Sequence, residues 1–113
     1  MSGVAGLYNV PSIQEELHTW SFIHASHHRD INRLLYQLLG ETVAEFIIDP
    51  FNPADSGDWL NNHQAMHTQI DAHIGISGYN LLAVDMTDEN QFGGWVFLNA
   101  DEHFKIANIL GIG

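Results

Sequence analysis

The most constraining feature of this sequence is a pattern of Trp, His and aliphatic residues that occurs three times. A polar residue follows each Trp after four positions, a His after eight, and aliphatic residues after eleven and fifteen. The copies are Trp20, His24, His28, Ile31 and Leu35; Trp59, His63, His67, Ile70 and Ile74; and Trp95, Asn99, His103, Ile106 and Leu110. With 8 His in 113 residues, chance would place a His after all three Trp with a probability of roughly (8/113)³, well under one in a thousand. The pattern is therefore a repeat.

The spacing of the repeat predicts helices. At about 100° per residue, its positions fall within one arc of an α-helix, so each copy presents one stripe. Burying a large side chain contributes about 1.5–3 kcal/mol, but a single helix cannot bury its own stripe. We therefore expect an all-α fold, a three-helix repeat bundle in which the stripes face one another.

Capping signals give the expected ends of these helices. Ser12 and Glu15 have the spacing of a capping box, Asp55 is the expected N-cap of the second helix, and Thr87 or Asp88 begins the third. A Gly follows each last periodic residue, as expected for helix C-termini. The predicted helices span residues 12–39, 56–74 and 87–110, followed by Gly40, Gly75 and Gly111.

Short apolar connectors belong to the repeat as well. The stretches 41–49 and 77–86 each contain an apolar segment closing on Asp49 or Asp85, ten residues before the next Trp. We expect them to pack across the helix ends, and periodicity leaves open whether they are helical or extended. The repeats then cover about residues 11–48, 49–84 and 85–113.

The length of 113 residues suits one domain. Residues 11–113 are the predicted helical domain, and residues 1–10, with small residues and no periodicity, are a predicted flexible N-terminal arm. No apolar run approaches the twenty residues of a membrane span, and no signal-peptide pattern is present. The absence of Cys excludes disulfides, thiol nucleophiles and thiolate metal ligands.

The charge is strongly acidic. Three Lys and Arg stand against fourteen Asp and Glu, for a net charge of −11. Such a chain repels nucleic-acid phosphates and anionic lipid surfaces, so we expect no direct nucleic-acid partner and no membrane association. The acids are scattered, which is typical of solvated helix faces.

The His residues are the candidates for chemistry. His24/His28 and His63/His67 have the i, i+4 spacing at which two imidazoles of one helix chelate a metal, and His103 could join them. Asn99 replaces His in the third copy, the stripes carry no carboxylate, and their neighbours are Trp and Ile. These features favour neutral, partly buried imidazoles that fix the register of the helices, with no metal or cofactor and no identified binding residue. The remaining His, which lie off the stripe, are predicted to be partly exposed: His18, His27 and His73.

The chain lacks the motifs of common enzymes. It has no Ser-His-Asp spacing, phosphate-binding Gly-rich loop or zinc-protease signature, so we predict that it is not an enzyme. An oxygen-binding di-iron bundle of the hemerythrin kind needs a His-x3-Glu pair and four helices. Only His67 and Asp71 approximate that pair.

The repeat, Trp-x3-His-x3-His-x2-Ile with an Ile/Leu-Gly-Ile ending, resembles small helical proteins encoded among the structural genes of tailed bacteriophages. The resemblance covers residues 20–112. It implies a structural or adaptor protein of a phage particle (capsid, neck or tail associated), present in many symmetric copies, contacting other virion proteins and assembled in the host cytoplasm. Two alternatives remain: a His-ligated metal-binding helical bundle with a redox or oxygen-binding function, and a helical docking module in a host cell.

Overall fold

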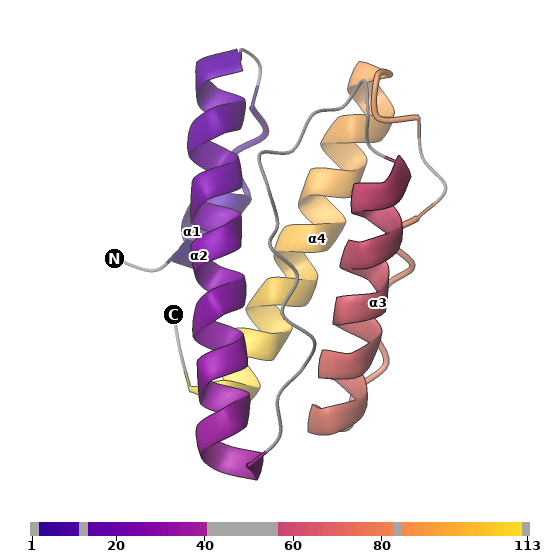
Figure 1. Ribbon diagram of the computed structural model, residues 1–113. Coiled ribbons are helices and arrows are strands. Elements are labelled where there is room, and N and C mark those ends of the chain that lie inside the picture. The colour runs from indigo at the N-terminus through magenta and orange to yellow at the C-terminus, as the bar shows by residue number, and fades with distance from the viewer. Residues whose placement is uncertain (1–2, 12–13, 41–56, 83–84, 112–113) are drawn as a thin grey trace.

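The fold is all-α in the part of the chain that the structure describes, as the stripes predict. A computed structural model describes residues 3–11, 14–40, 57–82 and 85–111. Its helices are α1 (Gly3–Leu7), α2 (Gln14–Leu39), α3 (Gly57–Ile74) and α4 (Glu89–Leu110) (Figure 1). The three long helices carry the three sequence copies, and α1 is an additional element.

The helix ends agree with the capping signals. The glycines that follow α2, α3 and α4 all have positive φ angles, of 67° at Gly40, 75° at Gly75 and 73° at Gly111. Glycine adopts this left-handed conformation without a steric cost, so it ends a helix well. At the start of α4, the Asp88 side chain accepts hydrogen bonds from the backbone N–H groups of Asn90 and Gln91. The predicted caps at Ser12 and Asp55 lie outside the described residues.

The long helices run in one direction. In Figure 1, α2, α3 and α4 each begin at the upper end of the molecule and finish at the lower end. The chain must therefore return over the length of α3 before α4 begins. Since α3 has 18 residues, it is about 27 Å long at 1.5 Å per residue. The fourteen residues from 75 to 88 can span about 46 Å at 3.3 Å each, enough for this return.

The connector after α3 lies along that helix, which corrects the prediction that it packs across the helix ends. The backbone N–H of Leu81 donates to the side chain of Gln64, in the middle of α3, over 2.7 Å. Leu81 is fully buried among core residues near the start of α3 and α4. Parallel helices require this path, and the sequence pattern contains no signal for helix direction. The other connector, at 41–49, lies outside the described residues.

Because the helices are parallel, equivalent positions of the three copies meet in layers. The ring centroids of Trp20 and Trp95 are 5.9 Å apart, and those of Trp59 and Trp95 are 5.7 Å apart. Towards the other end, the equivalent residues Ile31, Ile70 and Ile106 lie in one cluster. The stripes thus face one another.

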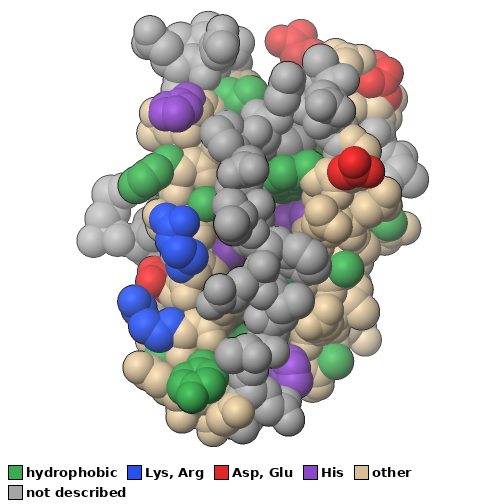
Figure 2. Space-filling view, in the orientation of Figure 1, with side chains coloured by type: hydrophobic (Ala, Val, Ile, Leu, Met, Phe, Trp, Pro, Cys, Tyr) green, Lys and Arg blue, Asp and Glu red, His purple; other side chains and the backbone are tan. Residues whose placement is uncertain are grey.

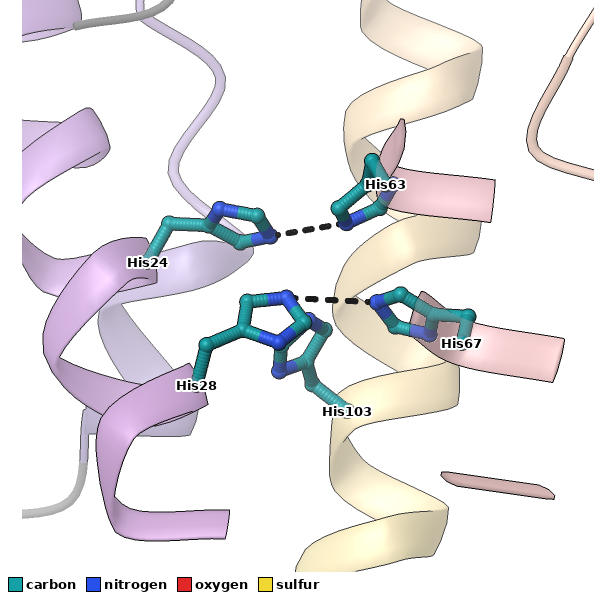
Figure 3. A group of neighbouring side chains, drawn as sticks. All are labelled: His24, His28, His63, His67 and His103. Carbon is teal, nitrogen blue, oxygen red and sulfur yellow. Dashed lines mark hydrogen bonds between the residues drawn. The ribbon is translucent and has the colours of Figure 1, made fainter. Parts of the chain in front are cut away.

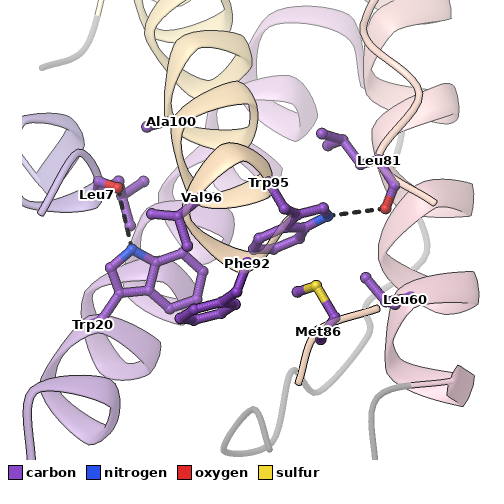
Figure 4. Close-up of a cluster of buried hydrophobic side chains, with 9 residues drawn as sticks. All are labelled: Leu7, Trp20, Leu60, Leu81, Met86, Phe92, Trp95, Val96 and Ala100. Carbon is purple, nitrogen blue, oxygen red and sulfur yellow. Dashed lines mark hydrogen bonds between the residues drawn. The ribbon is translucent and has the colours of Figure 1, made fainter. Parts of the chain in front are cut away.

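Two apolar clusters hold the helices together, and in each copy the His follow the Trp position and precede the Ile position. The first cluster surrounds the Trp layer and includes Leu7, Trp20, Leu60, Leu81, Met86, Phe92, Trp95, Val96 and Ala100 (Figure 4). The second comprises Ile31, Leu35, Met66, Ile70 and Ile106. The first cluster also orders two indoles, since Trp20 Nε1 donates to the Leu7 carbonyl over 3.2 Å and Trp95 Nε1 to the Leu81 carbonyl over 3.0 Å.

Residues 3–11 differ from the flexible arm predicted for residues 1–10. They contain α1, which packs against α2 and α4. Val4 and Leu7 are buried, with 4% and 0% of their surface exposed. A Cβ atom at Gly6 would lie 3.1 Å from Ile23, so glycine permits the close approach to α2. The small residues that suggested flexibility serve this contact.

The charges on the face drawn in Figure 2 are unevenly distributed, although Arg33 pairs with Asp30 on α2 over 2.7 Å. The Lys and Arg side chains lie over α2, and Asp and Glu side chains gather near the end where α3 and α4 begin. Asp58 and Glu89 stand in the first turns of these helices, where negative charge offsets the parallel helix dipoles. Among the described residues, no helix is long and apolar enough to cross a bilayer.

Candidate metal centre

Five imidazoles from three helices meet in the core. They are His24 and His28 of α2, His63 and His67 of α3, and His103 of α4 (Figure 3). The i, i+4 spacing points both His of α2 and both His of α3 to the same side, as the stripe requires. All five are buried, none with more than 2% of its surface exposed.

The ring nitrogens converge. One nitrogen from each of the five imidazoles can be chosen so that all lie within 4.8 Å of one another. His24 Nε2 and His63 Nε2 are 3.2 Å apart, and His28 Nε2 and His67 Nε2 are 3.3 Å apart. Both distances join α2 to α3, and His103 of α4 lies beside them, with 4.5 Å between its ring centroid and that of His28.

Burial keeps these imidazoles neutral. It lowers the pKa of His67 to about 4, partly offset by the nearby carboxyl of Asp71. Burial also lowers the pKa of the other four His well below the usual 6.5, and their neighbouring imidazoles add to that effect. Neutral imidazole is the form that binds transition metals.

Hydrogen bonding between the His accounts for only part of this arrangement. Two neutral imidazoles share one proton, so the pairs His24/His63 and His28/His67 make one hydrogen bond each. The Nε2 atom of His103 is buried and has no hydrogen-bonding partner among the described residues. Lone pairs aimed at one point repel one another, and a cation at that point would engage all of them.

Two buried carboxyl groups lie behind His67. The Glu102 side chain is fully buried, and its Oε2 lies 2.9 Å from His67 Nδ1. Since His67 is neutral, a proton on Nδ1 faces Glu102 and leaves Nε2 free for the centre. Burial and a hydrogen bond with Glu102 raise the pKa of Asp71 to about 8, and burial also raises the pKa of Glu102.

A glycine makes room for these carboxyl groups. A Cβ atom at Gly78 would clash with the carboxyl oxygens of both Glu102 and Asp71. The connector that returns along α3 therefore passes directly over the pair.

The His that lie off the stripe have different surroundings. His18 and His73 are exposed, as predicted. The same prediction is wrong for His27. This residue is only 4% exposed, because its side of α2 faces α4. His27 Nδ1 lies 2.6 Å from His103 Nδ1, a contact that requires one of them to donate. With the proton on His103, its Nε2 is left as a lone pair.

Asn99 stands where the third copy lacks a His. It is fully buried, and neither amide atom has a hydrogen-bonding partner of good geometry among the described residues. Its amide lies beside His24 and favours the protonated form of that imidazole, although burial still holds the His24 pKa well below 6.5.

Trp rings cover the His layer on one side. Trp20 stacks on His24 with ring centroids 4.8 Å apart and an angle of 11° between the planes. Trp59 stacks on His63 in the same way, at 4.7 Å and 13°. The Trp-x3-His spacing of the first two copies is thus the spacing of a stacked pair on one helix face.

The sequence pattern identified the five imidazoles but missed their supporting residues. Glu102 precedes His103 and so lies about 100° away from the stripe, as His27 does beside His28. Nothing local marks either residue as buried. The position of Asp71 did indicate a place near the centre, since it follows His67 by four residues on the same helix face. Comparison with protein-family models, curated proteins and solved structures finds no match to this chain.

Proposed function

We propose that this chain is a metal-binding protein that holds one first-row transition-metal ion at His24, His28, His63, His67 and His103. The observation that carries the proposal is the convergence of five neutral, buried imidazole nitrogens within 4.8 Å of one another. A metal ion satisfies all of them at once, which their mutual hydrogen bonds do not.

The spacing of the nitrogens fits a single ion. With metal–nitrogen bonds of about 2.1 Å, neighbouring ligands are about 3.0 Å apart in an octahedron and about 3.4 Å apart in a tetrahedron. Opposite ligands of an octahedron are then about 4.2 Å apart. The distances of 3.2 and 3.3 Å across the two His pairs match these values, and the largest separation of 4.8 Å must contract by about 0.6 Å to reach the octahedral value.

The ligand type restricts the metal. An all-imidazole set in a chain without Cys suits Zn²⁺, Cu²⁺, Ni²⁺ or Fe²⁺ and disfavours Ca²⁺ and Mg²⁺, which prefer oxygen ligands. Glu102 Oε2, at 2.9 Å from Nδ1 of His67, lies where the outer partner of a metal-bound His usually lies. The carboxyl groups of Asp71 and Glu102 also place acidic groups next to a core that would otherwise carry two uncompensated positive charges.

The proposal gives the repeat a role. We infer that the three copies form a three-helix repeat bundle in which each helix contributes its polar positions to one centre. Two apolar layers then exclude water from it on either side. Burial of polar residues in the middle of a core is costly unless they are paired or bind an ion, and here the repeat concentrates them at one place.

Elemental analysis of the protein, purified without a His tag, tests the proposal. We expect about one equivalent of a transition metal per chain. The variants His28→Asn and His67→Asn should lose at least tenfold in metal affinity, measured by competition with a chromophoric chelator. Asn is a suitable replacement because Asn99 already occupies an equivalent buried position.

His18→Asn and His73→Asn are the matched controls, since both residues are exposed. They should bind metal as the unmodified chain does. Wild-type protein that contains no metal and takes up no Co²⁺, Ni²⁺, Cu²⁺ or Zn²⁺ at micromolar concentration would overturn the proposal and favour imidazoles that only fix register.

The virion-associated role implied by the repeat stays a separate prediction. It concerns the outer surface and its partners, and a metal centre in the core is compatible with it. Mass spectrometry of intact phage particles tests that role, and consistent absence of the chain from them would contradict it.

A further inference from the structure

The repeat provides six positions around the centre, of which the His fill five. The parallel helices place the first polar position of each copy in one layer: His24, His63 and Asn99. The second positions form the next layer: His28, His67 and His103. Two stacked triangles are the vertices of an octahedron, so the arrangement is that of a six-coordinate site with one differing corner.

The contacts within the layers agree with this description. In the first layer, His24 meets His63 through Nε2 atoms 3.2 Å apart. In the second, the ring centroid of His103 lies 4.5 Å from that of His28 and 4.9 Å from that of His67.

Asn99 stands at the sixth of these positions, and its amide is buried there. The side chain has no exposed surface, its amide lies beside His24, and neither its Oδ1 nor its Nδ2 has a hydrogen-bonding partner of good geometry among the described residues. A buried amide in this condition is destabilising unless a bound group supplies the missing partner. An amide is a poor ligand for the metals that imidazole prefers, but it is a good hydrogen-bond donor.

We propose that the metal keeps its sixth coordination position for a small exogenous ligand, and that the Asn99 amide donates a hydrogen bond to that ligand. This inference rests on the proposed metal centre and adds a second binding event to it. The ligand is a small anion, because five neutral imidazoles leave the charge of a divalent ion uncompensated within the first shell.

The surroundings limit the size of the ligand. Trp20 and Trp59 stack on His24 and His63, the two His that belong to the same layer as Asn99. Val96 and Ala100, neighbours of Asn99 along α4, are fully buried in the same core. This burial restricts the ligand to a small one.

Azide binding to the Co²⁺-loaded protein tests the inference. Titration of the wild-type chain with azide should change the d–d absorption of Co²⁺ in a saturable manner with one site per metal. Asn99→His restores the His that the other two copies have at this position, and its imidazole should fill the sixth corner. That variant should bind Co²⁺ one to one and give no response to azide.

Two further variants complete the test. Asn99→Ala removes the donor but keeps the position free, so azide should still bind, with a Kd roughly tenfold higher, as expected for one lost hydrogen bond to a charged ligand. Asn108→His adds a His on an exposed side of the same helix and should respond to azide as the wild type does.

The outcomes separate this inference from the metal site itself. Failure of the wild-type chain to bind Co²⁺ would refute both proposals. Stoichiometric Co²⁺ binding with an absorption spectrum insensitive to azide would overturn this inference and leave the metal centre standing. Equal azide affinity in wild type and Asn99→His would also overturn it.

Discussion

The orientation of a single imidazole depends here on a residue outside the repeat. Glu102 Oε2 lies 2.9 Å from His67 Nδ1, while His67 Nε2 faces His28. Gly78 in turn determines where the Glu102 carboxyl can lie, because a Cβ atom there would occupy the same space. Outer contacts of this kind typically change metal affinity by about 10–100-fold when they are lost.

Gly78→Ala tests this chain of contacts. The new methyl group must displace the carboxyl groups of Glu102 and Asp71, so we expect metal affinity to fall by about 10–100-fold. A chelator competition assay measures the change.

Gly94→Ala is the matched control for that variant, because a Cβ at Gly94 meets nothing within 4 Å. It should keep the wild-type affinity, and as a replacement within α4 it should raise stability by up to about 1 kcal/mol. Equal affinity for Gly78→Ala and Gly94→Ala would show that Glu102 does not position His67.

Among the elements, α1 shows how a short helix without periodicity becomes part of the core. Its five residues are too few to form a stable helix in isolation. Leu7 instead enters the cluster around the Trp layer, and its carbonyl accepts the hydrogen bond of Trp20 Nε1. Tertiary contacts therefore order a segment whose composition suggests flexibility.

Leu7→Ala should destabilise the protein by about 2–5 kcal/mol, since it leaves a cavity where a fully buried Leu now packs. Urea unfolding followed by Trp fluorescence measures the loss. Asn9→Ala, at an exposed position just after α1, should change the free energy of unfolding by less than about 0.5 kcal/mol. A flexible arm would instead make both substitutions equally mild.

At the scale of the whole molecule, the core combines imidazoles and carboxyl groups, whose titrations change the free energy of unfolding in opposite directions as the pH changes. The metal-free imidazoles have folded pKa values below 6.5, so the unfolded state binds more protons as the pH falls below that value. The carboxyl of Asp71, with a folded pKa of about 8, holds a proton that the unfolded chain releases above about pH 4. His67 faces both kinds of group, with His28 on α2, Glu102 on α4 and Asp71 on its own helix.

We therefore expect the stability of the metal-free protein to peak near pH 6.5–7. Stability should fall as the pH drops from about 6.5 towards 4, because the unfolded chain then binds protons that the buried imidazoles do not. Each imidazole contributes up to about 1.4 kcal/mol per pH unit to this loss, and the several His together outweigh the opposite effect of the carboxyl groups. It should also fall more gently as the pH rises towards 8, through Asp71. Urea unfolding in the presence of a chelator measures this profile.

Asp71→Asn should remove the alkaline decline and leave the acidic one. A flat stability profile between pH 7 and 5 would contradict the burial of neutral imidazoles.

The sequence by itself determined the helices, their ends at Gly40, Gly75 and Gly111, and the five His that share one stripe, because these follow from periodicity and capping along a single segment. Only the tertiary structure decided that the helices are parallel and that the connector returns along α3. It also decided that His27 and Glu102, which lie off the stripe, are buried beside His103 and His67. The burial of an off-stripe residue depends on which neighbouring helix faces it, and local periodicity carries no information about that neighbour.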